Sequence, residues 1–162
     1  MTIQTKSNRI LRDLDVLSNI HKNSKTVVQM TLTTYDEKLC KILEPNVSTT
    51  RERVEALKVF QENGIPTVVW LTPILPFIND TRENIEGILE YCIQTNVKGI
   101  ICPDMGVTLR EGDREYFYQA LDKHFPGMRE IYQKKYGYAY EVSSIHKKEL
   151  MQLFNKTCEN ME

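Results

Sequence analysis

Segments with the residue pattern of β-strands alternate along most of this chain with segments that have the pattern of α-helices. Alternation of this kind builds a parallel sheet whose strands are joined by helices. Four strands are predicted, at residues 2–7, 26–33, 67–72 and 97–102. A closed barrel of parallel strands needs about eight. The first strand follows Met1 directly, so we expect the rest of such a fold to lie upstream of it.

The predicted helices between the strands begin at recognisable capping sequences. Thr49 followed by Glu52, and Asp80 followed by Glu83, have the spacing of capping boxes. Ser143 or Ser144 is the predicted cap of the last helix. The helices are predicted at residues 9–21, 36–43, 49–64, 80–96, 113–125, 126–136 and 144–161, with a long loop at 103–112.

These elements predict an α/β fold: a partial TIM-type β/α barrel of about four parallel strands, followed by C-terminal helices. We place the partial barrel at residues 1–112 and the helices at residues 113–162, packed on the same domain. The incomplete sheet has outer strands with unpaired N–H and C=O groups. We therefore expect self-association through a sheet edge, or a last helix that folds back over one.

The charge and hydropathy of the chain say little about its partners. The formal net charge is −1, which gives no whole-molecule attraction to nucleic acid or membranes and leaves a local basic patch open. No apolar stretch approaches the ~20 residues that span a bilayer. No signal peptide pattern opens the chain. We predict a cytoplasmic protein and leave nucleic acid open as a partner.

The cysteines and histidines do not form a metal-binding pattern. None of the cysteines are close enough in sequence for a C-x-x-C ligand set, and the histidines are equally scattered. We therefore predict no metal ligands in this chain. Cys92 and Cys158 follow apolar helical stripes, which favours reduced thiols in the core.

Polar side chains alternate with apolar ones along the second predicted strand. Period two places Gln29, Thr31 and Thr33 on one face, opposite an apolar set made of Val28, Met30 and Leu32. The interior of a packed barrel is usually branched and apolar, so three polar residues indicate an interior that binds a ligand. The alternative is that the threonines face solvent on a poorly covered sheet.

Further candidates lie after the strands, where β/α barrels carry their active sites, in segments 6–7, 31–35, 72–80 and 102–112. Lys6 at the end of the first strand is a candidate anion binder, or a lysine that extends to solvent at the rim. Glu44 and Arg53 are expected either to form an ion pair, buried or on the surface, or to bind an amino-acid head group. The loop around Arg110 lacks the G-K-[ST] sequence of a phosphate loop.

Several short motifs, in a fixed order, carry a family resemblance. They are Thr5-Lys6-Ser7 with Arg12-Asp13-Leu14-Asp15, Thr31-Leu32-Thr33-Thr34 with Asp36-Glu37, Leu43-Glu44-Pro45 with Arg53, Gly64-Ile65-Pro66, Pro73-Ile74-Leu75-Pro76 with Asn79-Asp80, and the segment from Gly106 to Gly112. Together they resemble the radical S-adenosylmethionine (SAM) superfamily, in its spore photoproduct lyase-like or DNA repair photolyase-like branch. The resemblance covers nearly the whole chain.

The resemblance implies SAM chemistry in an intact parent protein. Members hold a [4Fe-4S] cluster in a C-x-x-x-C-x-x-C loop, which leaves one iron free to bind SAM, and they cleave SAM to a 5′-deoxyadenosyl radical. That loop is absent from this sequence. The resemblance therefore implies a C-terminal fragment of a radical SAM iron–sulfur enzyme. The fragment is expected to be inactive by itself, and whether the parent acts on DNA stays open.

The resemblance also implies roles for single residues. Lys6 and Thr31 correspond to residues near the amino-acid end of SAM, with Glu44 and Arg53 as support, and Pro73 lies near the adenosine. With Gln29 and Thr33 these residues form the predicted cofactor-binding set, and Cys102 is a candidate hydrogen-atom donor. The alternative function is a free-standing α/β module that binds another small ligand without a cluster. A third hypothesis is a complete, small aldolase-like barrel.

Overall fold

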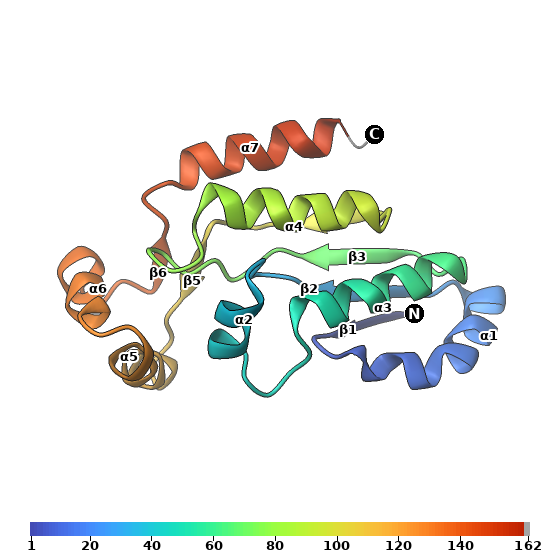
Figure 1. Cartoon of the computed structure of the whole chain (residues 1–162), viewed down its shortest axis with the longest axis horizontal. Helices are drawn as coiled ribbons and strands as arrows, with labels where there is room; N and C mark the ends of the chain where they lie inside the picture. Colours follow the sequence, from blue (N-terminus) through green and yellow to red (C-terminus); the bar gives the residue numbers. More distant parts are fainter. Residues whose placement is uncertain (161–162) are drawn as a thin grey trace.

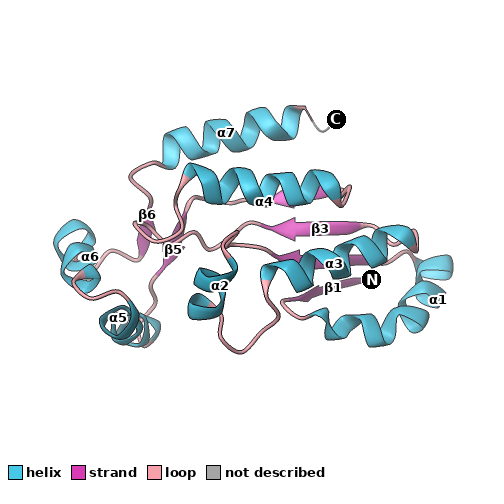
Figure 2. Ribbon diagram, viewed as in Figure 1, coloured by secondary structure: helices cyan, strands magenta, loops and turns pink. Residues whose placement is uncertain are grey.

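The computed structural model describes residues 1–160 and is built on a four-stranded parallel sheet (Figures 1 and 2). The strands lie side by side in chain order, so the predicted α/β class and the number of parallel strands are confirmed. Strands β1 and β4 each pair on one side only within the described residues, so these four strands do not close a barrel. The strands are β1 (Thr2–Thr5), β2 (Val27–Thr31), β3 (Thr67–Trp70) and β4 (Gly99–Ile101).

Each connection between neighbouring strands contains at least one helix. A 3-10 helix, η1 (Asn8–Asp13), and α1 (Leu14–Ser24) join β1 to β2. Helices α2 (Glu37–Leu43) and α3 (Thr50–Glu62) join β2 to β3, and α4 (Arg82–Gln94) joins β3 to β4. No helix within residues 1–160 combines the length and the apolar character needed to cross a membrane.

The two faces of the sheet differ as the period-two pattern predicts. Met30 and Val69 are fully buried on the face that packs against helices α3, α4 and α7 (Lys147–Glu159), and this face holds the main core. On the opposite face Gln29, Val68 and Trp70 keep part of their surface exposed. The structure therefore has one covered face and one partly open face.

Two of the predicted helix caps differ from the structure. Thr49 and Glu52 form the predicted capping box of α3, but α4 is capped by Thr81, which accepts from the backbone of Asn84. The prediction of an Asp80 cap is wrong because the Asp80 carboxylate instead accepts a hydrogen bond from Ser144. Helix α7 begins after His146, which makes no side-chain cap bond, but Ser144 Oγ accepts from the backbone N–H of His146 at 3.0 Å in the turn that leads into the helix. Its predicted end at Met161 lies outside the described residues.

A two-stranded antiparallel ribbon lies beyond the carboxyl ends of the parallel strands (Figure 1). It pairs β5 (Gly106–Thr108) with β6 (Glu141–Ser143), so the prediction of an unbroken loop at residues 103–112 is wrong. Gly106 is required here because a Cβ at this position would lie 2.5 Å from the carbonyl oxygen of Val142. The ribbon brings residues from the end of the chain next to the sheet.

The C-terminal helices pack in two places. Helices α5 (Asp113–His124) and α6 (Met128–Tyr136) enclose a small second core with the ribbon, in which Tyr132 is fully buried and donates to the carbonyl oxygen of Pro76 at 2.6 Å. Helix α7 runs alongside α4 (Figure 1) and adds Leu150 and Phe154 to the main core. The domain division at residue 112 and association through a sheet edge stay predictions.

Candidate functional site

The loops that follow the four parallel strands meet at one edge of the sheet. Parallel strands end at the same edge, so the residues after them become neighbours although they are far apart in sequence. Lys6 follows β1, Thr33 follows β2, Pro73 follows β3 and Asp104 follows β4. The β5–β6 ribbon lies next to this edge (Figure 2). These residues line two adjoining hollows.

A buried arginine supports the charged side chains of the first hollow. Arg53 is fully buried on the first turn of α3 and donates to the carbonyl oxygens of Ser48 at 2.7 Å and Thr31 at 2.9 Å. Its Nη2 lies 2.8 Å from Oε2 of Glu44. The geometry between these two atoms is that of an ion pair rather than a hydrogen bond, because neither has a hydrogen-bond partner. The buried guanidinium charge is therefore compensated by Glu44.

Glu44 also binds the lysine at the end of β1. Its Oε1 lies 2.6 Å from Nζ of Lys6, a contact that is both an ion pair and a hydrogen bond. The Lys6 side chain is 41% exposed, whereas that of Glu44 is 11% exposed. An ammonium group has three N–H donors, so two remain for a ligand. Lys6, Glu44 and Arg53 together carry one net positive charge.

The loop after β2 is fixed to the loop after β3 by two asparagines. Asn79 and Asn84 each donate from Nδ2 to the carbonyl oxygen of Thr33 at 2.9 Å. Oδ1 of Asn79 accepts from the backbone N–H of Leu75 at 2.6 Å. These bonds satisfy buried polar groups and hold both loops in one arrangement.

The first hollow, here named the Lys6 hollow, has a volume of about 260 Å³. Lys6, Glu44 and Asp113 supply its charged lining, and its neutral polar lining is Thr33, Asn79 and Thr108. The exposed Asp113 balances the net positive charge of the Lys6 network. The hollow therefore offers an ammonium and a carboxylate to a ligand. Its apolar lining is Leu43, Pro73, Leu75, Val107, Leu109 and Phe117.

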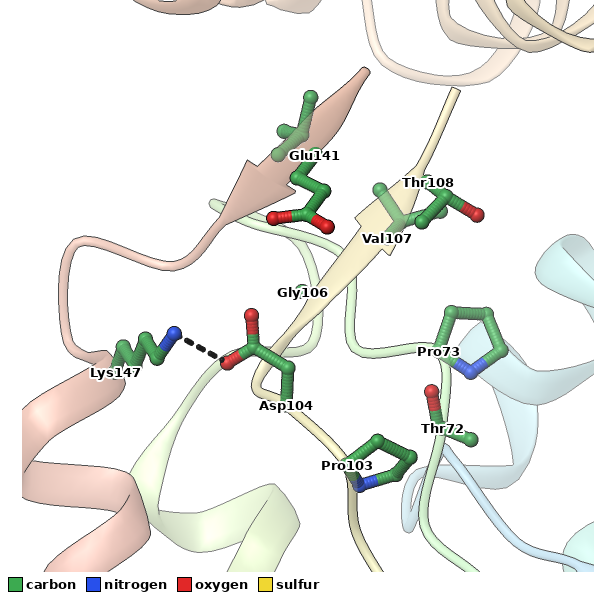
Figure 3. Close-up of a pocket in the computed structure, with 10 residues that line it drawn as sticks. Thr72, Pro73, Pro103, Asp104, Gly106, Val107, Thr108, Glu141 and Lys147 are labelled. Atoms are coloured by element: carbon green, nitrogen blue, oxygen red, sulfur yellow. Dashed lines mark ion pairs between the residues drawn. The ribbon is translucent and has the colours of Figure 1, made fainter. Parts of the chain in front are cut away.

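The second hollow, here named the Asp104 hollow, has a volume of about 650 Å³ and is shown in Figure 3. Asp104 accepts from Ser143 Oγ at 2.9 Å and from the backbone N–H of Met105 at 2.7 Å, and it pairs with Lys147 at 3.0 Å. Partial burial raises the pKa of Asp104, but the hydrogen bonds from Lys147, Ser143 and Met105 outweigh it and leave the pKa below its ordinary value. Glu141 lines the same hollow (Figure 3), so the charged lining is one cation and two carboxylates.

The two hollows share a wall. Pro73, Val107 and Thr108 line both of them. The Lys6 hollow lies toward β1 and β2, and the Asp104 hollow lies toward β4 and β6. Charged side chains therefore lie on both sides of this shared wall.

The structure brings together four of the seven predicted cofactor-binding residues. Lys6, Thr33, Glu44 and Pro73 line the Lys6 hollow. The other three lie behind or below it: Arg53 contacts Glu44, the carbonyl of Thr31 accepts from Arg53, and Gln29 accepts from Trp70 Nε1 at 2.6 Å on the partly open face.

Cys102 lies apart from the two hollows. It packs against the helix-covered core with Cys158. Burial, followed by the nearby Asp104 and Cys158, raises the pKa of Cys102 to about 12. The role of Cys102 as hydrogen-atom donor stays a prediction.

The residues that sequence reasoning missed come from the C-terminal half of the chain. They are Glu141 and Lys147, which line the Asp104 hollow. Asp104 and Thr108, which line it too, lie in the candidate segment 102–112 that follows the fourth predicted strand. Nothing in the local sequence indicates that Glu141 and Lys147 return to the sheet edge.

The described cysteines do not fit an iron–sulfur cluster. Cys40 and Cys92 are fully buried. No group of three His, Cys, Asp or Glu side chains within residues 1–160 is arranged to hold a metal ion.

Comparison with known proteins finds relatives that match parts of their own length. The chain is 35% identical over 82 residues to the uncharacterized protein MJ0683 of Methanocaldococcus jannaschii, covering 51% of this chain and 30% of the relative. It is 34% identical over 92 residues to the uncharacterized protein ORF301 of Acidianus two-tailed virus, covering 57% and 30%. It is 23% identical over 136 residues to the uncharacterized protein Rv2578c of Mycobacterium tuberculosis, covering 84% and 39%.

The chain therefore spans less than half the length of these curated relatives. No family model matches it. Among solved structures, Streptococcus suis SuiB bound to S-adenosylmethionine is similar at 17% identity with a TM-score of 0.45, covering 75% of this chain and 28% of SuiB. A TM-score of this size does not establish a shared fold.

Proposed function

We propose that residues 1–160 form part of the SAM-binding wall of a radical SAM protein, and that the four-stranded sheet is part of its β/α barrel. The proposal rests on the ordered motifs of the sequence and on the chemistry of the Lys6 hollow. The observation that carries it is the ion-pair chain from buried Arg53 through Glu44 to Lys6, 2.8 Å and then 2.6 Å.

This ion-pair chain suits the amino-acid end of SAM. The Lys6 ammonium, held in place by Glu44, would bind the carboxylate of the ligand through its two remaining N–H groups. Asp113, in the same hollow, would bind the amino group. Because Arg53 fixes Glu44 from a fully buried position, Lys6 is oriented before the ligand arrives.

The Asp104 hollow suits the other end of the ligand. Asp104 is held ionised by its three donors, and Glu141 adds a second carboxylate. Carboxylates accept hydrogen bonds from ribose hydroxyls, as acidic residues of dinucleotide-binding folds do. Pro73 and Val107 would pack against the adenosine on the shared wall. When bound, SAM supplies the 5′-deoxyadenosyl group that the resemblance implies for the parent protein.

The [4Fe-4S] ligands of the parent would come from outside residues 1–160, and this part of the chain alone would not cleave SAM. Anaerobic reconstitution with iron and sulfide is expected to give no [4Fe-4S] absorbance near the level of one cluster per chain. A cluster that forms and cleaves SAM would overturn this part of the proposal. The photoproduct lyase-like branch is the finer assignment, and it rests on the sequence motifs alone.

Equilibrium dialysis with radiolabelled SAM tests the proposed site. Lys6→Ala should weaken SAM binding at least about tenfold, as expected for a lost charged hydrogen bond. Lys38→Ala, an exposed lysine on α2, is the matched control and should bind SAM like the wild type. Equal affinities of the two variants would contradict the assignment, and would favour a module that binds a different small ligand.

A further inference from the structure

A third hollow lies between α2 and α5, on the side of the molecule where the parallel strands end (Figure 1). It has a volume of about 380 Å³ and is here named the α2–α5 groove. Its walls are mainly apolar and include Ile42, Leu43, Leu75, Tyr116, Phe117 and Ala120. Ile42 is 40% exposed and Tyr116 is 76% exposed, so apolar surface lies open to solvent at its rim. An apolar hollow with a few polar groups is the usual form of a small-molecule site.

The charged groups of the groove have one sign. Lys123 and His124, in the last turn of α5, are its basic lining residues, and no acidic side chain lines it within the described residues. Lys123 forms no ion pair with any residue in the range 1–160, so its charge is available to a ligand. The carbonyl end of the α5 dipole offsets part of this charge. The groove is therefore complementary to an apolar body that carries an anionic group.

The groove adjoins the Lys6 hollow. Leu43, Leu75 and Phe117 line both. A ligand in the groove would be separated from a ligand in the Lys6 hollow by these apolar side chains. A substrate-binding site and a cofactor-binding site that act together need to be neighbours in this way.

We propose that the α2–α5 groove binds an amphipathic organic anion, with an aromatic or aliphatic body against Leu75 and Phe117 and a carboxylate, phosphate or sulfonate near Lys123. As the seat of the parent's substrate, this inference rests on the proposed function. The proposal that this anion binds in the groove depends only on the groove itself, and not on the proposed function. The Lys6 hollow differs from it in carrying a carboxylate.

Two fluorescent probes of similar size test the proposal on the full chain. The anionic probe is 1-anilinonaphthalene-8-sulfonate, and the neutral probe is N-phenyl-1-naphthylamine. We expect one site per chain for the anionic probe. Ala120→Trp, which fills the groove, should weaken both probes at least tenfold. Lys123→Glu should weaken the anionic probe about fivefold and leave the neutral probe unchanged, and Lys135→Glu on α6 is the matched control that should change neither.

The outcomes separate the alternatives. If Ala120→Trp loses its circular dichroism spectrum, Tyr116→Ala serves instead, because this exposed side chain contributes little to folding. Unchanged probe affinity in a folded groove variant would overturn the proposal. A dimer in sedimentation that Tyr116→Ala dissociates would also overturn it, in favour of a second copy of this chain. If the chain binds SAM but not the probes, only the proposal for the groove is overturned. If it binds the probes but not SAM, only the proposed function is overturned.

Discussion

The carboxylate of Glu44 lies 2.8 Å from the guanidinium of Arg53, a side chain with no exposed surface. Removing one partner of a buried ion pair leaves the other charge uncompensated in a medium of low polarity. Glu44→Gln should therefore lower the free energy of unfolding by about 3 kcal/mol. Urea unfolding measures this change.

Glu55→Gln is the matched control for Glu44→Gln. Glu55 forms an exposed pair with Lys58 at 2.7 Å on the same helix as Arg53. Exposed pairs of this type contribute about 0.5 kcal/mol or less. If both variants lose a similar free energy of unfolding, the buried charge of Arg53 does not need Glu44 to compensate it.

Gly87 lies on α4 where no side chain fits. A Cβ at this position would lie 2.4 Å from the ring of Tyr35. Gly87→Ala should displace that ring and cost about 1–3 kcal/mol of stability, as overpacking of a core does. Thermal unfolding should show a lower Tm. Gly99→Ala in β4 is the control, because nothing lies within 4 Å of its added Cβ, and an equal loss there would refute the steric explanation.

Local sequence predicted which residues lie on each face of the sheet and which polar residues lie at its carboxyl edge. It did not predict the β5–β6 ribbon. Met30 and Thr31 alternate because a strand has period two, and this alternation is visible without any tertiary information. Asp80 has the sequence of a cap but binds Ser144, sixty-four residues away. Contacts of this length depend on the tertiary path of the chain, which is also why Lys147 was not predicted beside Asp104.

The Asp104 carboxylate should make stability depend on pH in acid. Hydrogen bonds from Lys147, Ser143 and Met105 hold its folded pKa below the ordinary value of 3.8. Its stabilising contribution is therefore complete above that value and is lost as pH falls through the folded pKa. Asp104→Asn should destabilise the fold near pH 7 by less than about 1 kcal/mol, because the side chain is partly exposed. The difference in the free energy of unfolding between the variant and the wild type should become smaller below pH 3.8. A difference that becomes larger in acid would contradict this prediction.

The thiols near α7 should react slowly. Burial raises the pKa of Cys92 to about 12, and that of Cys102 to about 12. The thiolate is the reactive form, so only about one such thiol in ten thousand is available at pH 8. Iodoacetamide labelling followed by mass spectrometry should be at least about 100-fold slower at these residues than in the urea-unfolded chain. Rapid labelling of Cys102 would return it to the candidates for a reactive thiol.

The central claim is that SAM occupies the joined Lys6 and Asp104 hollows. Titration of the ¹⁵N-labelled chain with SAM, followed by amide chemical shifts, tests it most directly. We expect saturable shifts at Lys6, Thr33, Thr108 and Asp113, which disappear in Lys6→Ala and persist in Lys38→Ala. No saturable shift at millimolar SAM, or shifts confined to α1 and to residues 153–159 of α7, would contradict it.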